Sequence, residues 1–151
     1  MDRRDLHFTS YAEISAEIQR LSKGYARAGK WSLGQICKHL SYYFRGSLEG
    51  FPAMLPWIIR ATVGRLALKG MLKGEKRKAG SPTAPASVYP PDIDEPQSVG
   101  EVLVLLDRLE KTQAQLYPSA LFGDLTNTQW KILHLNHAAH HLGFLHPRKF
   151  S

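Results

Sequence analysis

Apolar residues recur at the spacing of one helix face in four separate stretches of the sequence. The first stretch begins at Ser10, which forms a capping-box pattern with Glu13, and it continues to about residue 22. The second begins at Ser32, which forms the same pattern with Gln35, and Gly50 ends it. The inner positions of these two predicted helices are Ile14, Ile18, Leu21, Leu33, Ile36, Leu40, Tyr43 and Phe44.

Two further helices are predicted in the second half of the chain. Residues 98–117 have the clearest helical period, and Ser98 with Glu101 is the predicted cap. Residues 126–145 open with a capping box of Thr126 and Gln129 and end before a proline. No stretch alternates apolar and polar residues as a half-buried strand does, so we predict an all-α protein.

The connections between these helices are unequal, and their lengths predict the topology. About nine residues join the first two helices and about eight join the last two, but nearly fifty separate the second from the third. Short connections favour antiparallel neighbours, whereas the long one permits a crossover that leaves the second and third helices parallel. We therefore predict one domain, residues 1–151, folded as a four-helix bundle with a long crossover.

The long connection divides into two parts. Residues 57–73 are basic and partly apolar, and we expect one or two short helices there, with a solvated helix flanking the core as the simplest interpretation. The alternatives are that this segment covers a pocket, pairs with a second subunit or touches an acidic surface. Residues 74–96 are rich in glycine, proline, serine and charges, which predicts extended loop.

Four of the seven histidines fall within residues 134–141, on the last predicted helix. His134, His137 and His141 project to one side of that helix together with apolar residues, and His140 points to another side. A buried cluster of imidazoles needs a polar partner, and a divalent metal is a common one. The alternative is that one or two of them are hydrogen-bonded core histidines, because His-x-x-x-His is a short motif that occurs by chance.

The predicted topology brings a further histidine to this stretch. His39 lies about 10 Å from the start of the second helix, and His137 and His141 lie roughly 6–12 Å from the end of the last one. If these two helices are antiparallel, the three imidazoles meet at one height and predict a three-histidine site. Such a donor set suits Zn²⁺, Ni²⁺ or Fe²⁺ and leaves a coordination position open, as catalytic sites do.

Four other residues of these two predicted helices carry polar or reactive side chains. His134 is a candidate general base, hydrogen-bond partner of a ligand or fourth ligand, and an equally good alternative is a hydrogen-bonded core histidine. Tyr43 is predicted to lie close to the metal. We expect His140 to support a ligand or to lie at an interface. Cys37 projects away from His39, so it is expected to be a packed core residue.

Charge and composition narrow the choice of function. The net charge is +7, but residues 57–80 carry +6 and residues 81–125 carry −5, which is typical of self-compensating surface rather than of a nucleic-acid site. No apolar run approaches the ~18 residues of a membrane span, and the N-terminus lacks the apolar region of a signal peptide. Together with a single cysteine, these features lead us to expect a cytoplasmic protein without a membrane partner.

Three motifs resemble the DinB/YfiT-like metalloenzyme superfamily. They are Trp-Ser-Leu-Gly-Gln-Ile-Cys-Lys-His-Leu at 31–40, His-Ala-Ala-His-His-Leu-Gly-Phe-Leu at 137–145, and Phe-Gly-Asp-Leu-Thr-Asn-Thr-Gln-Trp at 122–130. The third is similar to a DinB-like subgroup classed only as a domain of unknown function. The resemblance implies a four-helix bundle, often dimeric, with divalent-metal ligands at His39, His137 and His141.

The resemblance leaves the reaction open. Some relatives are metal-dependent transferases that act with low-molecular-weight thiols such as bacillithiol or mycothiol. Our first hypothesis is therefore a metal-dependent enzyme, a thiol-S-transferase or hydrolase, that acts on a small molecule with His134 and Tyr43 beside the metal. The second is a non-catalytic dimeric binding or stress-response module that the metal braces. Nucleic-acid binding through residues 60–78 is the third.

Overall fold

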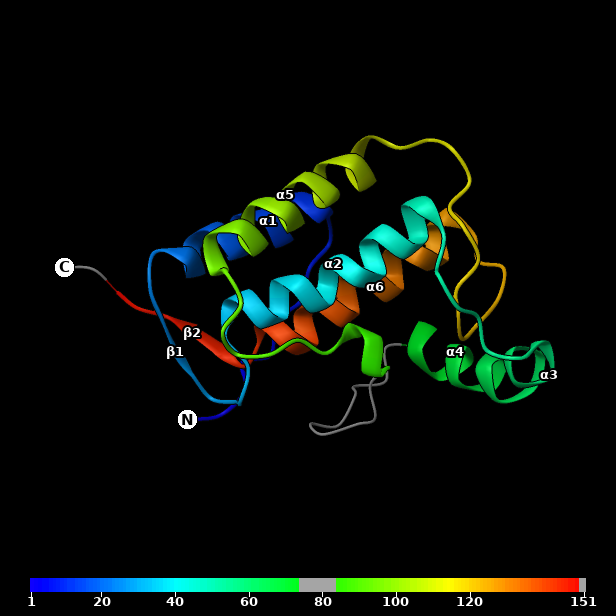
Figure 1. The fold of residues 1–151 in the computed structure, drawn as a ribbon, viewed down its shortest axis with the longest axis horizontal. Coiled ribbons are helices and arrows are strands. Elements are labelled where there is room, and N and C mark those ends of the chain that lie inside the picture. The colour runs from blue at the N-terminus through cyan, green and yellow to red at the C-terminus, as the bar shows by residue number, and fades with distance from the viewer. Residues whose placement is uncertain (74–83, 150–151) are drawn as a thin grey trace.

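A computed structural model describes residues 1–73 and 84–149, which are mostly helical and include one small two-stranded sheet (Figure 1). The longer helices are α1 (Tyr11–Ser22), α2 (Leu33–Glu49), α5 (Glu95–Lys111) and α6 (Asn127–Leu142). Within the described residues, no helix combines the length and the apolar character needed to cross a bilayer.

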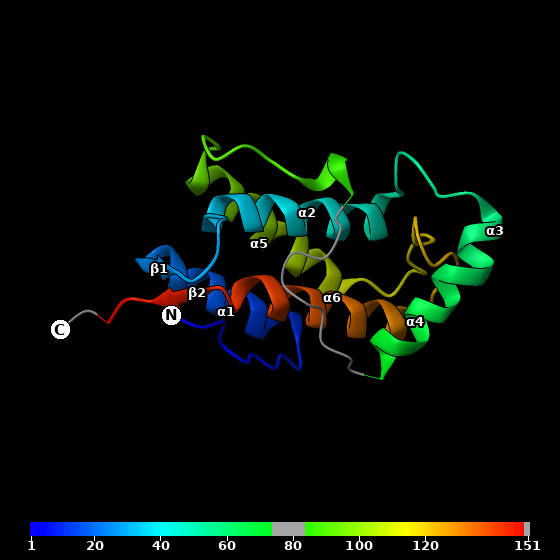
Figure 2. The same ribbon diagram turned by 90° about the horizontal axis from the view of Figure 1, so that it is seen from below.

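The four longer helices lie side by side in two directions (Figures 1 and 2). Helices α2 and α5 run parallel, whereas α1 and α6 run the opposite way. These are the relative directions that the unequal connections predicted. The core between the helices is formed by apolar side chains from all four, including Ile14, Ile18, Leu40, Phe44, Leu106 and Leu142.

The capping patterns predicted the starts of three helices correctly. Ser32 and Gln35 form a complete capping box at α2, and Thr126 and Gln129 form one at α6. At α1, the Ser10 side chain accepts the Glu13 N–H as expected, but Glu13 returns its carboxylate to Thr9 rather than to Ser10. Reciprocal capping therefore fixes the first turn of the two helices that carry the histidines.

The predicted limits of the third helix were wrong at both ends. Helix α5 begins at Glu95 because the Asp94 side chain accepts the Gln97 N–H, and a proline occupies its first turn. Ser98 lies inside the helix and donates its hydroxyl to the Asp94 carbonyl, and Glu101 pairs with Lys38. The helix ends at Lys111, and Leu116 belongs to the following connection, where its N–H is donated to the Asn127 side chain.

The prediction that the chain contains no strand was also wrong. Strands β1 (Tyr25–Arg27) and β2 (Leu145–Pro147) pair antiparallel, with Ala26 opposite His146. Three residues are too few to show an alternating pattern, and the partners lie 120 positions apart in the sequence. The pair joins the segment before α2 to the segment after α6, which holds the N-terminus of one helix beside the C-terminus of the other (Figure 1).

The long connection crosses one end of the molecule (Figure 2). It forms α3 (Trp57–Ile59), the π-helical turn η1 (Arg60–Gly64) and α4 (Arg65–Leu72), which confirms the short helices expected there. A 3₁₀ turn, η2 (Pro85–Ser87), follows, and α5 already begins before residue 96. The remainder of the predicted loop, residues 74–83, lies outside the described residues.

Candidate metal site

Helix α2 contributes one histidine to the site. His39 lies a little under two turns into the helix and is 1% exposed. It lies between the core residues Ile36 and Leu40, and its Nε2 faces that of His137 on α6. His39 and His137 therefore lie at the same level along their two helices, as the sequence predicted.

Helix α6 contributes two histidines from consecutive turns. His137 and His141 are four residues apart and lie on the same face, 8% and 9% exposed. They belong to the last two turns of α6, where β2 ties the chain to the segment before α2. The small sheet thus fixes the end of α6 that carries these two rings.

The three imidazoles converge through their Nε2 atoms. The Nε2 of His137 lies 2.9 Å from that of His39 and 3.1 Å from that of His141. Nitrogen ligands 2.0–2.1 Å from one ion are roughly 2.9–3.4 Å apart for octahedral to tetrahedral angles. These two separations fit neighbouring ligands of one metal ion, and the ligand atoms of all three histidines lie within 4.8 Å of one another.

The tautomer of His39 supports this interpretation. Its Nδ1 lies 2.8 Å from the carbonyl oxygen of Ser87 and donates its hydrogen to it, since a carbonyl can only accept. The neutral ring then presents the Nε2 lone pair to His137 and His141. A single proton on His137 can serve only one of its two close neighbours, so a shared cation satisfies the cluster better.

Aromatic rings surround the three histidines. The Trp31 ring stacks on His141 at 5.3 Å between centroids and also contacts His39 at 5.0 Å. Tyr43 meets His39 and His137 edge to face, at 5.2 and 4.8 Å. The packed rings of Trp31 and Tyr43 restrict the rotamers of the imidazoles and so pre-organise them for binding an ion.

Ser87 connects Tyr43 to the site. Its hydroxyl donates to the Ala84 carbonyl at 2.7 Å, so at 3.2 Å the Tyr43 hydroxyl donates to the Ser87 oxygen. The same residue accepts the His39 N–H through its carbonyl. Tyr43 therefore lies next to the cluster as predicted, and it steadies the turn that orients His39.

Within the described residues, the group able to hold a metal ion consists of His39, His137 and His141. These are the three that the sequence placed together. All three donors are imidazole nitrogens, a set that suits Zn²⁺, Ni²⁺ or Fe²⁺ better than Ca²⁺ or Mg²⁺. The arrangement can bind a divalent ion of this kind, and the identity of the ion stays a prediction.

His134 lies one turn before His137 but in different surroundings. Its ring stacks on Trp130 at 4.7 Å between centroids, and Phe44 packs edge-on against it. Since Ser47 donates its own hydrogen to a backbone carbonyl, its hydroxyl oxygen accepts the His134 Nε2–H at 2.9 Å. Burial lowers the pKa of His134 to about 3, so the ring is neutral at ordinary pH.

This environment is that of a hydrogen-bonded core histidine, the alternative that the sequence left open. His134 is not among the three residues whose ligand atoms gather. Its predicted catalytic role stays a prediction, and the contacts of its ring are with Tyr11, Phe44, Ser47 and Trp130.

The other polar candidates lie around the cluster rather than in it. His140 is half-buried and accepts a hydrogen bond at Nδ1 from the Arg3 guanidinium, and its ring meets His141 edge to face. Cys37 is fully buried in the core, as predicted, and burial raises the pKa of its thiol. The Nε2–H of His146 donates a hydrogen bond to the Asp2 carbonyl.

Sequence reasoning missed two contributors to the site. Ser87 belongs to a region predicted only as loop, and no local pattern indicates that its carbonyl meets a histidine 48 positions away. Trp31 was considered only as the first residue of the motif at 31–40 and not as a neighbour of the histidines. The signal that could have found it is its place just before the N-cap of the helix that carries His39.

Comparison with known proteins gives a family but no reaction. No curated protein and no solved structure matches the chain. A family model described as a protein of unknown function, DUF1569, matches residues 1–148, which is nearly the whole sequence. The chain therefore belongs to the DUF1569 family.

Proposed function

We propose that this protein is a DinB/YfiT-like metal-dependent enzyme whose divalent ion is held by His39, His137 and His141. The observation that carries the proposal is the convergence of three imidazole Nε2 atoms, with 2.9 and 3.1 Å between neighbours, in a buried setting. The antiparallel approach of α2 and α6 supports the further proposal that α1, α2, α5 and α6 form the four-helix bundle of that superfamily.

The proposed reaction class is thiol-S-transfer or hydrolysis on a small molecule, with a low-molecular-weight thiol as one candidate substrate. Bound to three protein ligands, a divalent ion supplies a coordination position at which the pKa of a thiol or water falls. The protein's own contribution is orientation. Ser87 fixes the tautomer of His39, and Trp31 and Tyr43 fix the planes of the rings.

One observation favours a second candidate, in which the metal only braces the helices of a dimeric binding or stress-response module. The three ligands are nearly inaccessible, with exposed fractions of 1 to 9%, and aromatic rings pack against them. Structural metal sites are closed in this manner, although they usually have four protein ligands. A homodimer and a cytoplasmic setting belong to both proposals.

The two candidates differ in whether a small molecule reaches the ion. We would load the protein with Co²⁺ and titrate it with 2-mercaptoethanol while recording the electronic spectrum. The enzyme proposal expects a saturable thiolate-to-cobalt charge-transfer band in the wild type and in His134→Gln, and no such band in His137→Ala. A cobalt protein with an intact ligand-field spectrum that never develops this band contradicts the enzyme proposal and supports the bracing role.

A further inference from the structure

The long connection presents an unusual number of apolar side chains to the outside. Trp57, Val63 and Leu66 are 70, 65 and 73% exposed, far more than core residues of their type. Their exposed apolar neighbours in the sequence are Met54, Leu55, Ile58 and Ile59. We call the outward side of residues 54–73 the crossover face. Exposed apolar residues gathered in one segment mark a binding site more often than apolar residues scattered singly over a surface do.

The opposite side of the same segment accounts for its attachment to the protein. Gly64 and Leu68 are buried, four residues apart, and Gly64 lies so close to the Leu121 carbonyl that a side chain there would overlap it. Ile59, Val63 and Leu66 follow the i, i+4, i+7 spacing of a different side. Only a narrow inner strip of the segment therefore packs against the protein, and large apolar side chains remain on its outer side.

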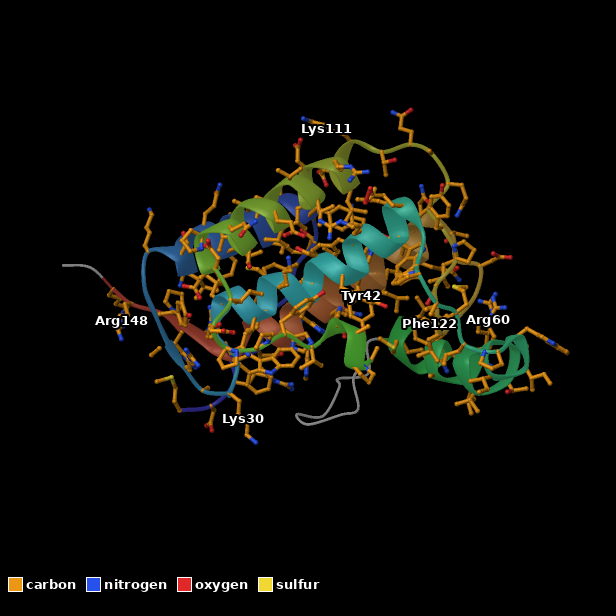
Figure 3. The ribbon with its side chains drawn as sticks, viewed as in Figure 1. Lys30, Tyr42, Arg60, Lys111, Phe122 and Arg148 are labelled. Atoms are coloured by element: carbon orange, nitrogen blue, oxygen red, sulfur yellow. The ribbon has the colours of Figure 1, made fainter. Side chains whose placement is uncertain are left out.

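Cations accompany these apolar residues. Residues 57–73 contain Arg60, Arg65, Lys69 and Lys73 and no carboxylate. Arg60 and Arg65 donate to the backbone carbonyls of Leu55 and Asp124, and in the described part of the chain none of the four is paired with an acidic side chain. Figure 3 shows Arg60 at the α3 end of the molecule near Phe122, well apart from Lys30 and Arg148.

We propose that the crossover face binds the surface of an anionic lipid bilayer. An interfacial helix of this type buries an apolar side that includes tryptophan and leucine at the boundary of headgroups and acyl chains, while lysine and arginine contact lipid phosphates. Trp57, Val63 and Leu66 enter the boundary, and Lys69 and Lys73 remain at the headgroups. The inference is independent of the proposed metal chemistry, and it replaces the expectation from the sequence that the protein has no membrane partner.

Charge favours a lipid surface over a second copy of the chain. A two-fold dimer through the crossover face would bring its four cations near the same four cations of the partner, which is unfavourable. An anionic bilayer instead supplies the opposite charge together with an apolar layer. A nucleic acid also carries negative charge, but its phosphate backbone has no apolar surface against which Val63 and Leu66 could be buried.

The test is co-sedimentation of the full-length protein with vesicles of phosphatidylcholine alone and with vesicles containing one-third phosphatidylglycerol. We expect binding only to the anionic vesicles, weakening as salt rises. Lys69→Glu/Lys73→Glu is expected to reduce the partition coefficient at least about 25-fold, since each basic residue contributes about fivefold. Val63→Ser/Leu66→Ser is expected to reduce it about tenfold or more through lost apolar burial.

Matched controls separate this surface from general charge and apolarity. Lys30→Glu/Arg148→Glu makes the same charge change at the opposite end of the molecule, and Val104→Ser replaces a 61% exposed valine on α5. Both should bind as the wild type does. The fluorescence of Trp57 should shift to the blue with anionic vesicles, and Trp57→Phe should remove that shift.

Three results would overturn the inference. One is an absence of binding to the anionic vesicles, and another is an equal loss of binding in the control variants. The third is concentration-dependent dimerisation that Val63→Ser/Leu66→Ser abolishes without any vesicle binding, which would assign the crossover face to a second copy.

Discussion

His134 and His137 lie one turn apart on α6, and different side chains pack against each of them. His134 meets Ser47, Phe44 and Trp130, which satisfy its Nε2–H and enclose its ring. His137 meets His39 across the helix interface, at the height where the Ser87 carbonyl has already taken the Nδ1–H of His39. The same residue type on the same stripe is thus a neutral core group in one turn and a candidate ligand in the next, because α2 offers a different partner to each.

The largest expected difference between the two histidines is in the response to metal. With free Zn²⁺ at about 1,000 times its dissociation constant, the wild type should gain about 4 kcal/mol in free energy of unfolding. For a chain of this size, that gain raises Tm by roughly 8–16 °C. The gain should vanish in His137→Ala and persist in His134→Gln, as measured by differential scanning calorimetry. If both variants lose the stabilisation by Zn²⁺ equally, His134 and His137 belong to the same metal site.

In the metal-free protein, truncating His134 should lower the free energy of unfolding more than truncating His140 on the same helix. His134→Ala leaves a cavity among aromatic rings and removes the partner of Ser47, so we expect a loss of about 3 kcal/mol in the unfolding free energy. His140→Ala, on the same helix but half-buried, should cost less than about 1 kcal/mol. Urea denaturation in the presence of a chelator measures both. If the two losses are similar, the pocket around His134 is not part of the stabilising core.

Acid should also act through His134. Its pKa is about 3 in the folded chain and about 6.5 when unfolded, so between these values the unfolded chain binds a proton that the folded one excludes. Stability from this group is therefore complete above pH 6.5 and falls by about 1.4 kcal/mol per pH unit as the pH drops toward 3.

The check compares metal-free wild type with His134→Gln by urea denaturation from pH 6.5 to 4. The other histidines titrate in both proteins, so only the difference in slope reports His134. We expect the variant's unfolding free energy to depend less steeply on pH by about one proton. Identical slopes would contradict the neutral, buried environment of the ring.

The smallest effects on stability and metal affinity are expected when the hydrogen bond that supports the Ser87 turn beside His39 is removed. Tyr43→Phe keeps the ring against His39 and His137 but removes the hydrogen bond to Ser87, which should cost about 1 kcal/mol in stability. Metal affinity should fall by no more than about tenfold, because the Ser87 carbonyl still accepts the His39 N–H. Isothermal titration with Zn²⁺ measures this, and unchanged affinity and stability would remove Tyr43 from the support of the site.

The site was predictable where local signals and helix geometry sufficed. The capping boxes at Ser32 and Thr126 set the positions of His39 and His137 along their helices, and an antiparallel arrangement brought them to one height. The role of His134 could not be decided in this way, because it depends on Ser47 and Phe44 from a facing helix rather than on its own stripe.

Long-range pairings account for the errors in the fold. Ser98 and Glu101 match a capping box by residue type, but Asp94 caps the helix and Glu101 is occupied by Lys38 and Arg45 across the α2–α5 interface. The strands β1 and β2 are three residues each and stable only as a pair. Neither feature leaves a periodic pattern in the sequence.

The central claim is that His39, His137 and His141 hold one metal ion and that His134 does not. The most direct measurement is the metal content, by elemental analysis, of wild type and the variants His39→Ala, His137→Ala, His141→Ala and His134→Gln after loading with Zn²⁺ and desalting. We expect about one ion per chain in the wild type and in His134→Gln, and a small fraction of that in the other three. A full complement of metal in each of the three alanine variants would contradict the claim.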